Sequence, residues 1–209
     1  MNDLILVWDT ETSGFPKDDL GLGHHTQPKL ASIAATLYKP DATQLASFNF
    51  IVRPDLNADG TPAWTMPPKV VKIHGISTEI AMAAGVTLRV AIAAFTNMRG
   101  RAAEIVAHNR KFDEKMVEIA LAYMGVKASN PWPEKRVCTC TDDAVVELVK
   151  AKPSAKQKQY YPDKKYKTPN LTELHTFLFK EGFEGAHGAA ADRDACARCF
   201  FELRKRGMV

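Results

Sequence analysis

Residues 4–14 read LILVWDTETSG, an apolar run that ends abruptly in polar residues and a glycine. A short apolar run closed by a turn signal predicts a buried β-strand. Because side chains alternate along a strand, Asp9 and Glu11 are expected to project from the same face. Two neighbouring carboxylates repel each other unless a cation lies between them, and Mg²⁺ or Mn²⁺ prefers such oxygen ligands. The stretch therefore predicts a strand end that holds a divalent metal, provided that the chain supplies further ligands.

The composition is that of an ordinary globular protein. The 209 residues fit one domain, or one domain with an insertion, and 45% of them are hydrophobic and 25% charged. The sequence begins MND, without the basic region and apolar stretch of a signal peptide, and no segment approaches the length of a membrane span. We therefore expect a cytoplasmic protein that has no membrane partner.

The four cysteines permit one alternative, a zinc site. Cys138 and Cys140 form a C-x-C pair, and Cys196 and Cys199 form a C-x-x-C pair. The second pair lies in the middle of a predicted helix, on its inward stripe, where cysteine behaves as a small core residue. We therefore favour core positions over zinc ligation for this pair.

Strands come first along the chain, and strands and helices then alternate. After the first strand, a hairpin is predicted from strands 30–38 and 46–52. The further predicted elements are helices 70–76 and 86–98 (the latter with Val90, Ala93 and Ala94 towards the core), strand 104–107, helix 111–124, strand 136–138, a helix capped by Thr141, a helix from Pro169-Asn170 to about Gly182, and a last helix from about His187 to Arg206. This order indicates an α/β layer structure with a mixed sheet.

One acid in the helix 111–124 has an inward position. Asp113 shares a helix face with Val117, Ala120 and Met124, whereas Glu114 and Glu118 share an outward face. An acid on the inward face of a helix requires a partner, because an unpaired buried charge is costly. Asp113 is therefore a candidate third carboxylate of the site.

The last helix contains two acids that differ in the face they occupy. Asp192 aligns with the apolar stripe of that helix, whereas Asp194 aligns with a largely solvent-facing stripe, on which it could form an i, i+4 ion pair with Arg198. Asp192 is the inward acid. His187 precedes it by five residues, among glycines and alanines that leave an imidazole accessible, as a general base must be.

Three motifs in order carry a family resemblance. The chain contains DTETSG after a buried strand, H-N-x-x-F-D at the start of a helix, and H-x4-D at the last helix. Together they resemble the three exonuclease motifs of the DnaQ-like DEDDh family of 3′-to-5′ exonucleases. Residues 33–34, 74–76 and 171–174 resemble that family as well, so the likeness covers nearly the whole chain.

The resemblance implies a fold, a site and a mechanism. The expected fold is α/β and ribonuclease H-like, a five-stranded mixed sheet flanked by helices, with residues 1–209 as a single exonuclease domain. Two Mg²⁺ or Mn²⁺ ions would clamp the scissile phosphate, and His187 would take the proton of the attacking water and define the DEDDh branch. The implied metal ligands are Asp9, Glu11, Asp113 and Asp192, and the implied contacts to the terminal nucleotide are Thr12, His74 and Asn109.

The expected function is a metal-dependent 3′-to-5′ exonuclease that releases nucleoside 5′-monophosphates from DNA 3′ ends. Single-stranded or frayed ends are the expected partner, in a proofreading or repair role, and a polymerase or other replication protein is a further expected partner. Two alternatives stay open: an exoribonuclease acting on RNA 3′ ends, and a catalytically silent nucleic-acid-binding or polymerase-binding module. The chain ends three residues after Arg206, so we expect a free-standing enzyme or docking through the folded surface.

A basic segment departs from the family pattern. Residues 150–167 read KAKPSAKQKQYYPDKKYK, with seven lysines, three tyrosines and the single acid Asp163. Lysines neutralise phosphates, and tyrosine rings offer faces on which bases stack. We expect a Lys/Tyr-rich loop at about 150–168, which is either a solvated surface loop or a contact for nucleic acid.

Overall fold

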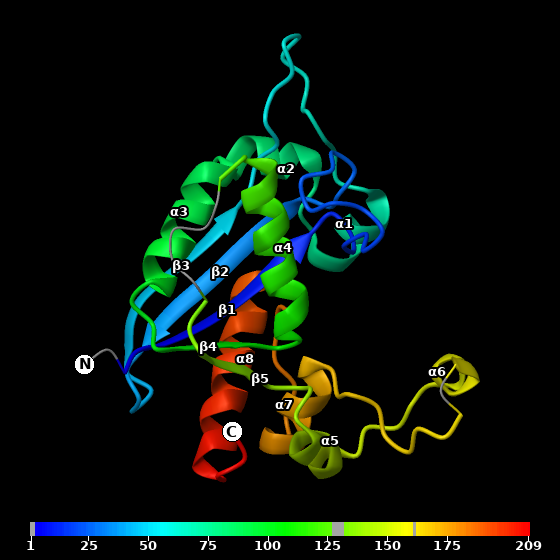
Figure 1. Cartoon of the computed structure of the whole chain (residues 1–209). Helices are drawn as coiled ribbons and strands as arrows, with labels where there is room; N and C mark the ends of the chain where they lie inside the picture. The colour runs from blue at the N-terminus through cyan, green and yellow to red at the C-terminus, as the bar shows by residue number, and fades with distance from the viewer. Residues whose placement is uncertain (1–2, 127–131, 161) are drawn as a thin grey trace.

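Five strands form one mixed sheet in the order β3-β2-β1-β4-β5 (Figure 1). The computed structural model describes residues 3–126, 132–160 and 162–209. Strand β1 pairs antiparallel with β2 and parallel with β4, while β2–β3 is antiparallel and β4–β5 is parallel. The strands are β1 Ile5–Thr12, β2 Leu30–Tyr38, β3 Gln44–Ile51, β4 Glu104–Ala107 and β5 Lys135–Cys138. This arrangement confirms the predicted fold class and the predicted hairpin after the first strand.

Helices cover both faces of the sheet (Figure 1). They are α1 Pro68–His74, α2 Thr78–Ala84, α3 Leu88–Arg99, α4 Arg110–Tyr123, α5 Asp143–Val149, α6 Ala155–Tyr160, α7 Leu171–Phe179 and α8 Ala189–Lys205. In the described parts of the chain, no helix combines the length and the apolar character required to cross a membrane.

The alternation of β1 divides the core into two layers. Leu6 and Trp8 pack with α3 and α4 on one face, whereas Ile5 and Val7 pack with α7 and α8 on the other face. The odd-numbered side chains of β1 therefore belong to the α8 face, and the even-numbered ones belong to the α4 face. This division decides where the polar residues at the end of the strand can point.

The end of one helix and the start of another lie where the sequence predicts them. Helix α1 ends at Gly75, whose φ of 76° is left-handed and favours glycine. Helix α7 begins at Asn170, whose side chain accepts a hydrogen bond from the Glu173 amide at 2.8 Å, while the Glu173 carboxylate accepts one from the Asn170 amide at 2.9 Å. This reciprocal pair is a capping box.

The predicted inward face of α3 is wrong. Val90 is 50% exposed, and Ala93 is also exposed, whereas the buried face carries Leu88, Ile92 and Phe95. The helical period was predicted correctly, but the larger side chains hold more apolar surface, so burying their face is favoured.

One acid was assigned to the wrong face, and a second has a different partner from the one expected. Glu114 is buried rather than outward, because Arg110 contacts it at 2.5 Å and Arg136 of β5 approaches to 3.8 Å. Asp194 is exposed as predicted, but it pairs with the adjacent Arg193 at 2.7 Å instead of Arg198.

The start of α5 is displaced by one residue from its prediction. Asp142, not Thr141, is the N-cap, and its carboxylate accepts a hydrogen bond from the Ala144 amide at 2.8 Å. The Thr141 hydroxyl is used elsewhere, in a hydrogen bond with Cys138. The expected Lys/Tyr-rich loop also contains a short helix, α6.

Candidate active site

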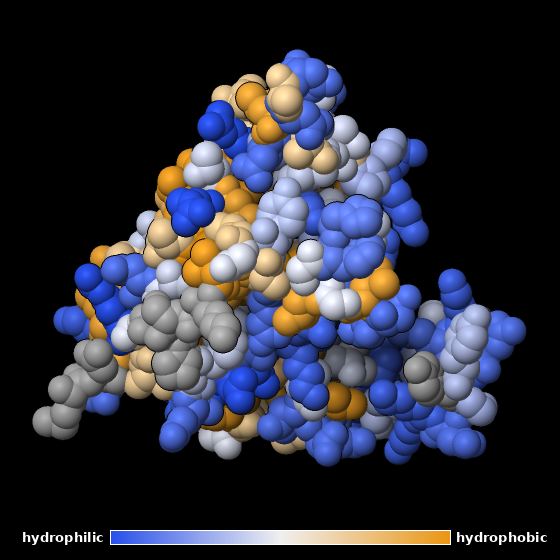
Figure 2. Space-filling view, turned by 45° about the horizontal axis from the view of Figure 1, so that its top comes forward, coloured by the Kyte–Doolittle hydropathy of each residue, from blue (hydrophilic) through white to orange (hydrophobic). Residues whose placement is uncertain are grey.

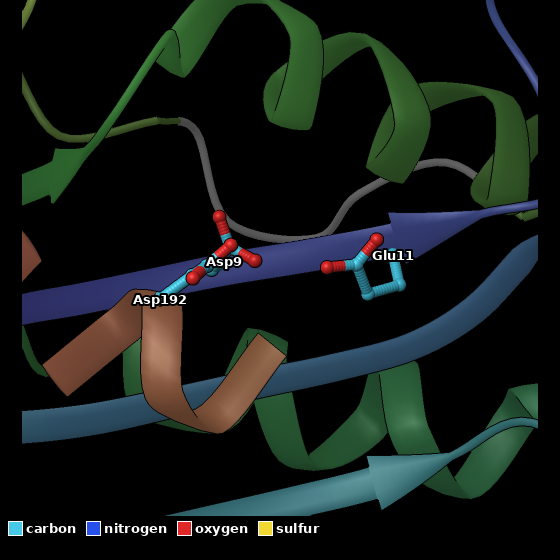
Figure 3. A group of neighbouring side chains, drawn as sticks. All are labelled: Asp9, Glu11 and Asp192. Carbon is cyan, nitrogen blue, oxygen red and sulfur yellow. The ribbon is translucent and has the colours of Figure 1, made fainter. Parts of the chain in front are cut away.

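Three carboxylates converge at the carboxyl end of β1. Asp9 and Glu11 project from β1 and Asp192 from the first turn of α8, as Figure 3 shows. One oxygen from each of these carboxylates lies within 4.8 Å of the other two. Asp9 and Glu11 share the α8 face because they are two residues apart on a strand, and α8 packs on that face.

Asp113 stands beside this group at the edge of β1. Its Oδ1 accepts hydrogen bonds from the Thr10 amide at 3.1 Å and from the Thr10 hydroxyl at 2.7 Å. The edge is available because β4 pairs only with residues 5–7 of β1, which leaves the last residues of the strand open to the start of α4. Asp113 is inward as predicted, and only 2% of it is exposed.

His187 lies at the rim of the group, in the loop before α8. Its backbone amide donates to both oxygens of the Asp192 carboxylate, each at 3.2 Å, so the loop orients that acid. The residue has a left-handed φ of 68° and is exposed. An exposed imidazole close to an oriented carboxylate can exchange protons with a bound molecule and with solvent.

The electrostatics of the group favour protonated acids when no cation is bound. Burial raises the pKa of Asp9 well above its usual range, and the charges of Asp113, Asp192 and Glu11 raise it further. Burial and then the neighbouring acids raise the pKa of Glu11 to about 8. Burial also raises the pKa of Asp113 to about 7, although the hydrogen bonds from Thr10 oppose it.

A divalent cation fits this donor set. The Arg193 charge lowers the pKa of Asp9, but its guanidinium hydrogen-bonds Asp194 and the Phe48 carbonyl. Carboxylate oxygens that are close together and short of positive charge are the ligands that Mg²⁺ and Mn²⁺ prefer. The acidic cluster Asp9, Glu11 and Asp192 therefore fits metal binding.

The predicted nucleotide contacts lie in two places: Thr12 and His74 at the end of β1, and Asn109 at the start of α4. Thr12 continues β1, and its hydroxyl donates to the Gly14 carbonyl at 2.7 Å. The His74 ring lies against the Thr12 backbone, which favours its charged form, although burial has the larger effect and lowers its pKa. Asn109 is exposed at the N-terminus of α4, with a left-handed φ of 61°, so it precedes the helix of Asp113.

The quoted motifs contain Thr10 and His108, but sequence reasoning assigned neither of them a role. His108 hydrogen-bonds the Thr139 hydroxyl at 2.9 Å through Nδ1 and the Pro169 carbonyl at 3.2 Å through Nε2. Burial lowers the pKa of His108 to about 4, so the ring is neutral at physiological pH. Its place at the start of the H-N-x-x-F-D motif, directly after β4, was the available signal; its partners could not be predicted, since they come from distant segments.

A mixed five-stranded sheet, with acids from β1, α4 and α8 at the end of one strand, is the ribonuclease H-like arrangement. A family model described as Exonuclease (RNase_T) matches residues 6–200. The chain belongs to this exonuclease family, which is the DnaQ-like group predicted from the motifs. A search of curated protein sequences found no match.

Solved structures of exonuclease I are similar in fold. The Escherichia coli enzyme in complex with a dT13 oligonucleotide has 18% sequence identity and a TM-score of 0.68, over 98% of this chain and 41% of that chain. The zinc-bound form of the E. coli enzyme with single-stranded DNA has 18% identity and a TM-score of 0.71, over 98% and 41% of the two chains. The enzyme from Methylocaldum szegediense has 16% identity and a TM-score of 0.67, over 97% and 40%. The chain thus spans about two fifths of the length of these proteins.

Proposed function

We propose that the chain is a single exonuclease domain that removes nucleoside 5′-monophosphates from the 3′ ends of DNA. The observation that carries the proposal is the convergence of Asp9, Glu11 and Asp192, with Asp113 beside them, in a chain of the exonuclease family. The preference for single-stranded or frayed DNA is supported by the fold, because the similar exonuclease I structures contain DNA oligonucleotides.

The carboxylates would hold two divalent ions, Mg²⁺ or Mn²⁺, with Asp113 completing the set. When bound, such ions stabilise the charge that develops on the attacking and leaving oxygens of a phosphodiester. The acids would hold the ions, and the Thr10 hydrogen bonds lower the pKa of Asp113 against the larger effect of burial. His187 would accept the proton of the attacking water, and its accessible position lets it pass that proton to solvent.

The test is hydrolysis of an oligonucleotide labelled at either end, in the presence of Mg²⁺. A 3′-label should be released at once as a mononucleotide, while a 5′-label should give a ladder of strands that shorten progressively. Asp9→Asn should reduce the rate to background, and His187→Ala should reduce it by about 10²-fold or more, the usual contribution of a positioned base.

Two matched variants control for non-specific effects. His25→Ala removes an exposed loop histidine, and Asp41→Asn removes an exposed acid at the hairpin turn, next to the end of β2 that pairs with the start of β1. Both should retain the activity of the unaltered protein. Asp9→Asn should remain folded, because it removes a repelling charge. Unchanged hydrolysis in both Asp9→Asn and His187→Ala would overturn the proposed site.

The same assay separates the alternatives. Single-stranded DNA, duplex DNA and RNA of one sequence are compared in parallel time courses. Faster loss of RNA would replace the DNA assignment with an exoribonuclease. If the protein binds all three nucleic acids but hydrolyses none of them with any divalent ion, it is a catalytically silent binding module.

A further inference from the structure

A basic arm, which we define as residues 150–160 and 162–168, extends from the body of the protein. Figure 1 shows α6 standing away from the sheet, and Figure 2 shows hydrophilic residues over the projection at the right. The arm carries seven lysines and the single acid Asp163. Such a concentration of charge on one projection requires an explanation beyond stability.

Apolar packing does not explain why α6 exists. The helix has no buried residue. It is closed instead by a local cap, in which the Ser154 amide donates to the Gln157 side chain at 2.9 Å and the Gln157 amide donates to the Ser154 hydroxyl at 3.2 Å. A six-residue helix that is exposed all round contributes little to folding. Its side chains are therefore available for a partner.

Several lysines of the arm are free to meet an anion. Lys152, Lys156 and Lys158 are exposed, and no carboxylate of a described residue lies within 4.0 Å of their ammonium groups. Lys167 differs, because it pairs with Glu173, and its amide donates to the Ala151 carbonyl at 2.9 Å. This lysine closes the base of the arm, whereas the other three present their charge to solvent.

The base of the arm is attached next to the candidate active site. The Pro169 carbonyl, directly after the arm, accepts a hydrogen bond from His108 at 3.2 Å. His108 follows β4 and comes shortly before Asp113 on α4. Because β1 and β4 are parallel, their carboxyl ends meet at one edge of the sheet. The arm and the acidic cluster therefore arise from the same edge.

We propose that the basic arm binds the sugar-phosphate backbone of the substrate strand outside the acidic cluster; this inference rests on the proposed function. Charge complementarity identifies the occupant, since unpaired ammonium groups on an exposed arm attract a flexible polyanion. Tyr160 is 68% exposed and offers a ring face for base stacking. The ring of Tyr166 is less available, because Lys165 Nζ lies 5.0 Å from its centroid.

Equilibrium binding tests the arm directly. Fluorescence anisotropy is measured in the Asp9→Asn background, which prevents degradation, with single-stranded DNA of about 30 nucleotides and of about 4 nucleotides. The arm variant replaces three lysines by glutamine (K152Q, K156Q and K158Q). A matched variant replaces three exposed cations near the opposite end of the sheet (K39Q, R101Q and K205Q).

The arm variant should bind the long strand roughly 10- to 100-fold more weakly at moderate salt. The slope of the logarithm of its binding constant against the logarithm of the salt concentration should become shallower by about 2. This slope follows from three lost contacts, each worth about 0.7 on a single strand. Affinity for the short strand should not change, and the matched variant should keep both affinities. Tyr160→Leu should weaken the binding of the long strand about five-fold or more, without changing the slope of the salt dependence.

Three outcomes overturn the proposal: equal losses in the arm and matched variants, an unchanged salt slope in the arm variant, or equally tight binding of a polyglutamate of the same charge. The last result would identify an acidic protein segment as the occupant. If the unaltered protein fails to hydrolyse DNA but the arm-dependent binding is observed, the proposed function fails while the nucleic-acid arm is supported.

Discussion

Thr10 carries a role that its neighbours on β1 do not. Asp9 and Glu11 point to the α8 face, whereas the Thr10 hydroxyl points to α4 and donates to Asp113 at 2.7 Å. The Thr10 amide donates to the same oxygen. These bonds fix one oxygen of a buried acid and leave the second oxygen for another partner. A residue between two candidate ligands thus orients a third.

Replacing the Thr10 hydroxyl should shift the pH dependence of activity. Thr10→Val removes one donor, so the pKa of Asp113 should rise above about 7, and the acid should be more protonated at neutral pH. Hydrolysis at pH 7 should fall about ten-fold, the lower end of the effect of losing a partner of a metal ligand, and should recover at higher pH. A pH–rate profile measures this change.

Thr10→Ser is the matched control, because it retains the hydroxyl. It should keep the profile of the unaltered protein. Identical profiles for the valine and serine variants would show that the hydrogen bond does not control Asp113.

Among the elements, α7 links the core to the basic arm. Its capping box uses Asn170 and Glu173, and Glu173 also pairs with Lys167 at the base of the arm. Asn170→Ala removes the cap side chain and leaves the Glu173 amide without its acceptor. The free energy of unfolding should fall by about 1 kcal/mol, measured by urea denaturation.

Thr172→Ala, at an exposed position of the same helix, is the comparison for that change. Its effect should stay within about 0.5 kcal/mol. An equal loss in both variants would indicate that helix propensity, rather than the cap, determines the stability of α7.

Elements with a strong period or a turn signal were predictable from the sequence. Strand β1, the hairpin and the end of α1 at Gly75 follow from apolar runs and from one left-handed position. Helix α6 was not predictable, because its residues are polar all round and its start depends on a local Ser154 cap. The burial of Glu114 was not predictable either, since Arg136 comes from another strand.

The candidate site was predicted in its residue types more fully than in its geometry. The alternation of β1 and the inward face of α8 bring Asp9, Glu11 and Asp192 together, as expected. The place of Asp113 at the edge of β1 depends on β4 ending early, which is a property of the whole sheet. The roles of His187 and of the nucleotide contacts stay predictions.

At the scale of the whole molecule, the acidic cluster lowers the stability of the fold when no cation is bound. The pKa of Glu11 is raised from 4.5 to about 8, so between these values the folded state holds a proton that the unfolded state has released. The free energy of unfolding therefore decreases as pH rises through this window. His108, with its pKa lowered from 6.5 to about 4, acts in the opposite direction below pH 6.5. The contribution of Glu11 to stability is therefore best measured above pH 6.5.

Glu11→Gln should therefore be more stable than the unaltered protein when divalent ions are absent, by a margin that grows from about pH 6.5 to about pH 8.5. Added Mg²⁺ should stabilise the unaltered protein, and increasingly so at higher pH, because metal binding requires deprotonated ligands and favours the folded state. Its effect on Glu11→Gln should be smaller. Thermal unfolding with EDTA and with Mg²⁺ at several pH values measures both effects, without depending on catalysis. A margin that shrinks as pH rises, or equal stabilisation of both proteins by Mg²⁺, would contradict the placement of Glu11 in a metal-binding cluster.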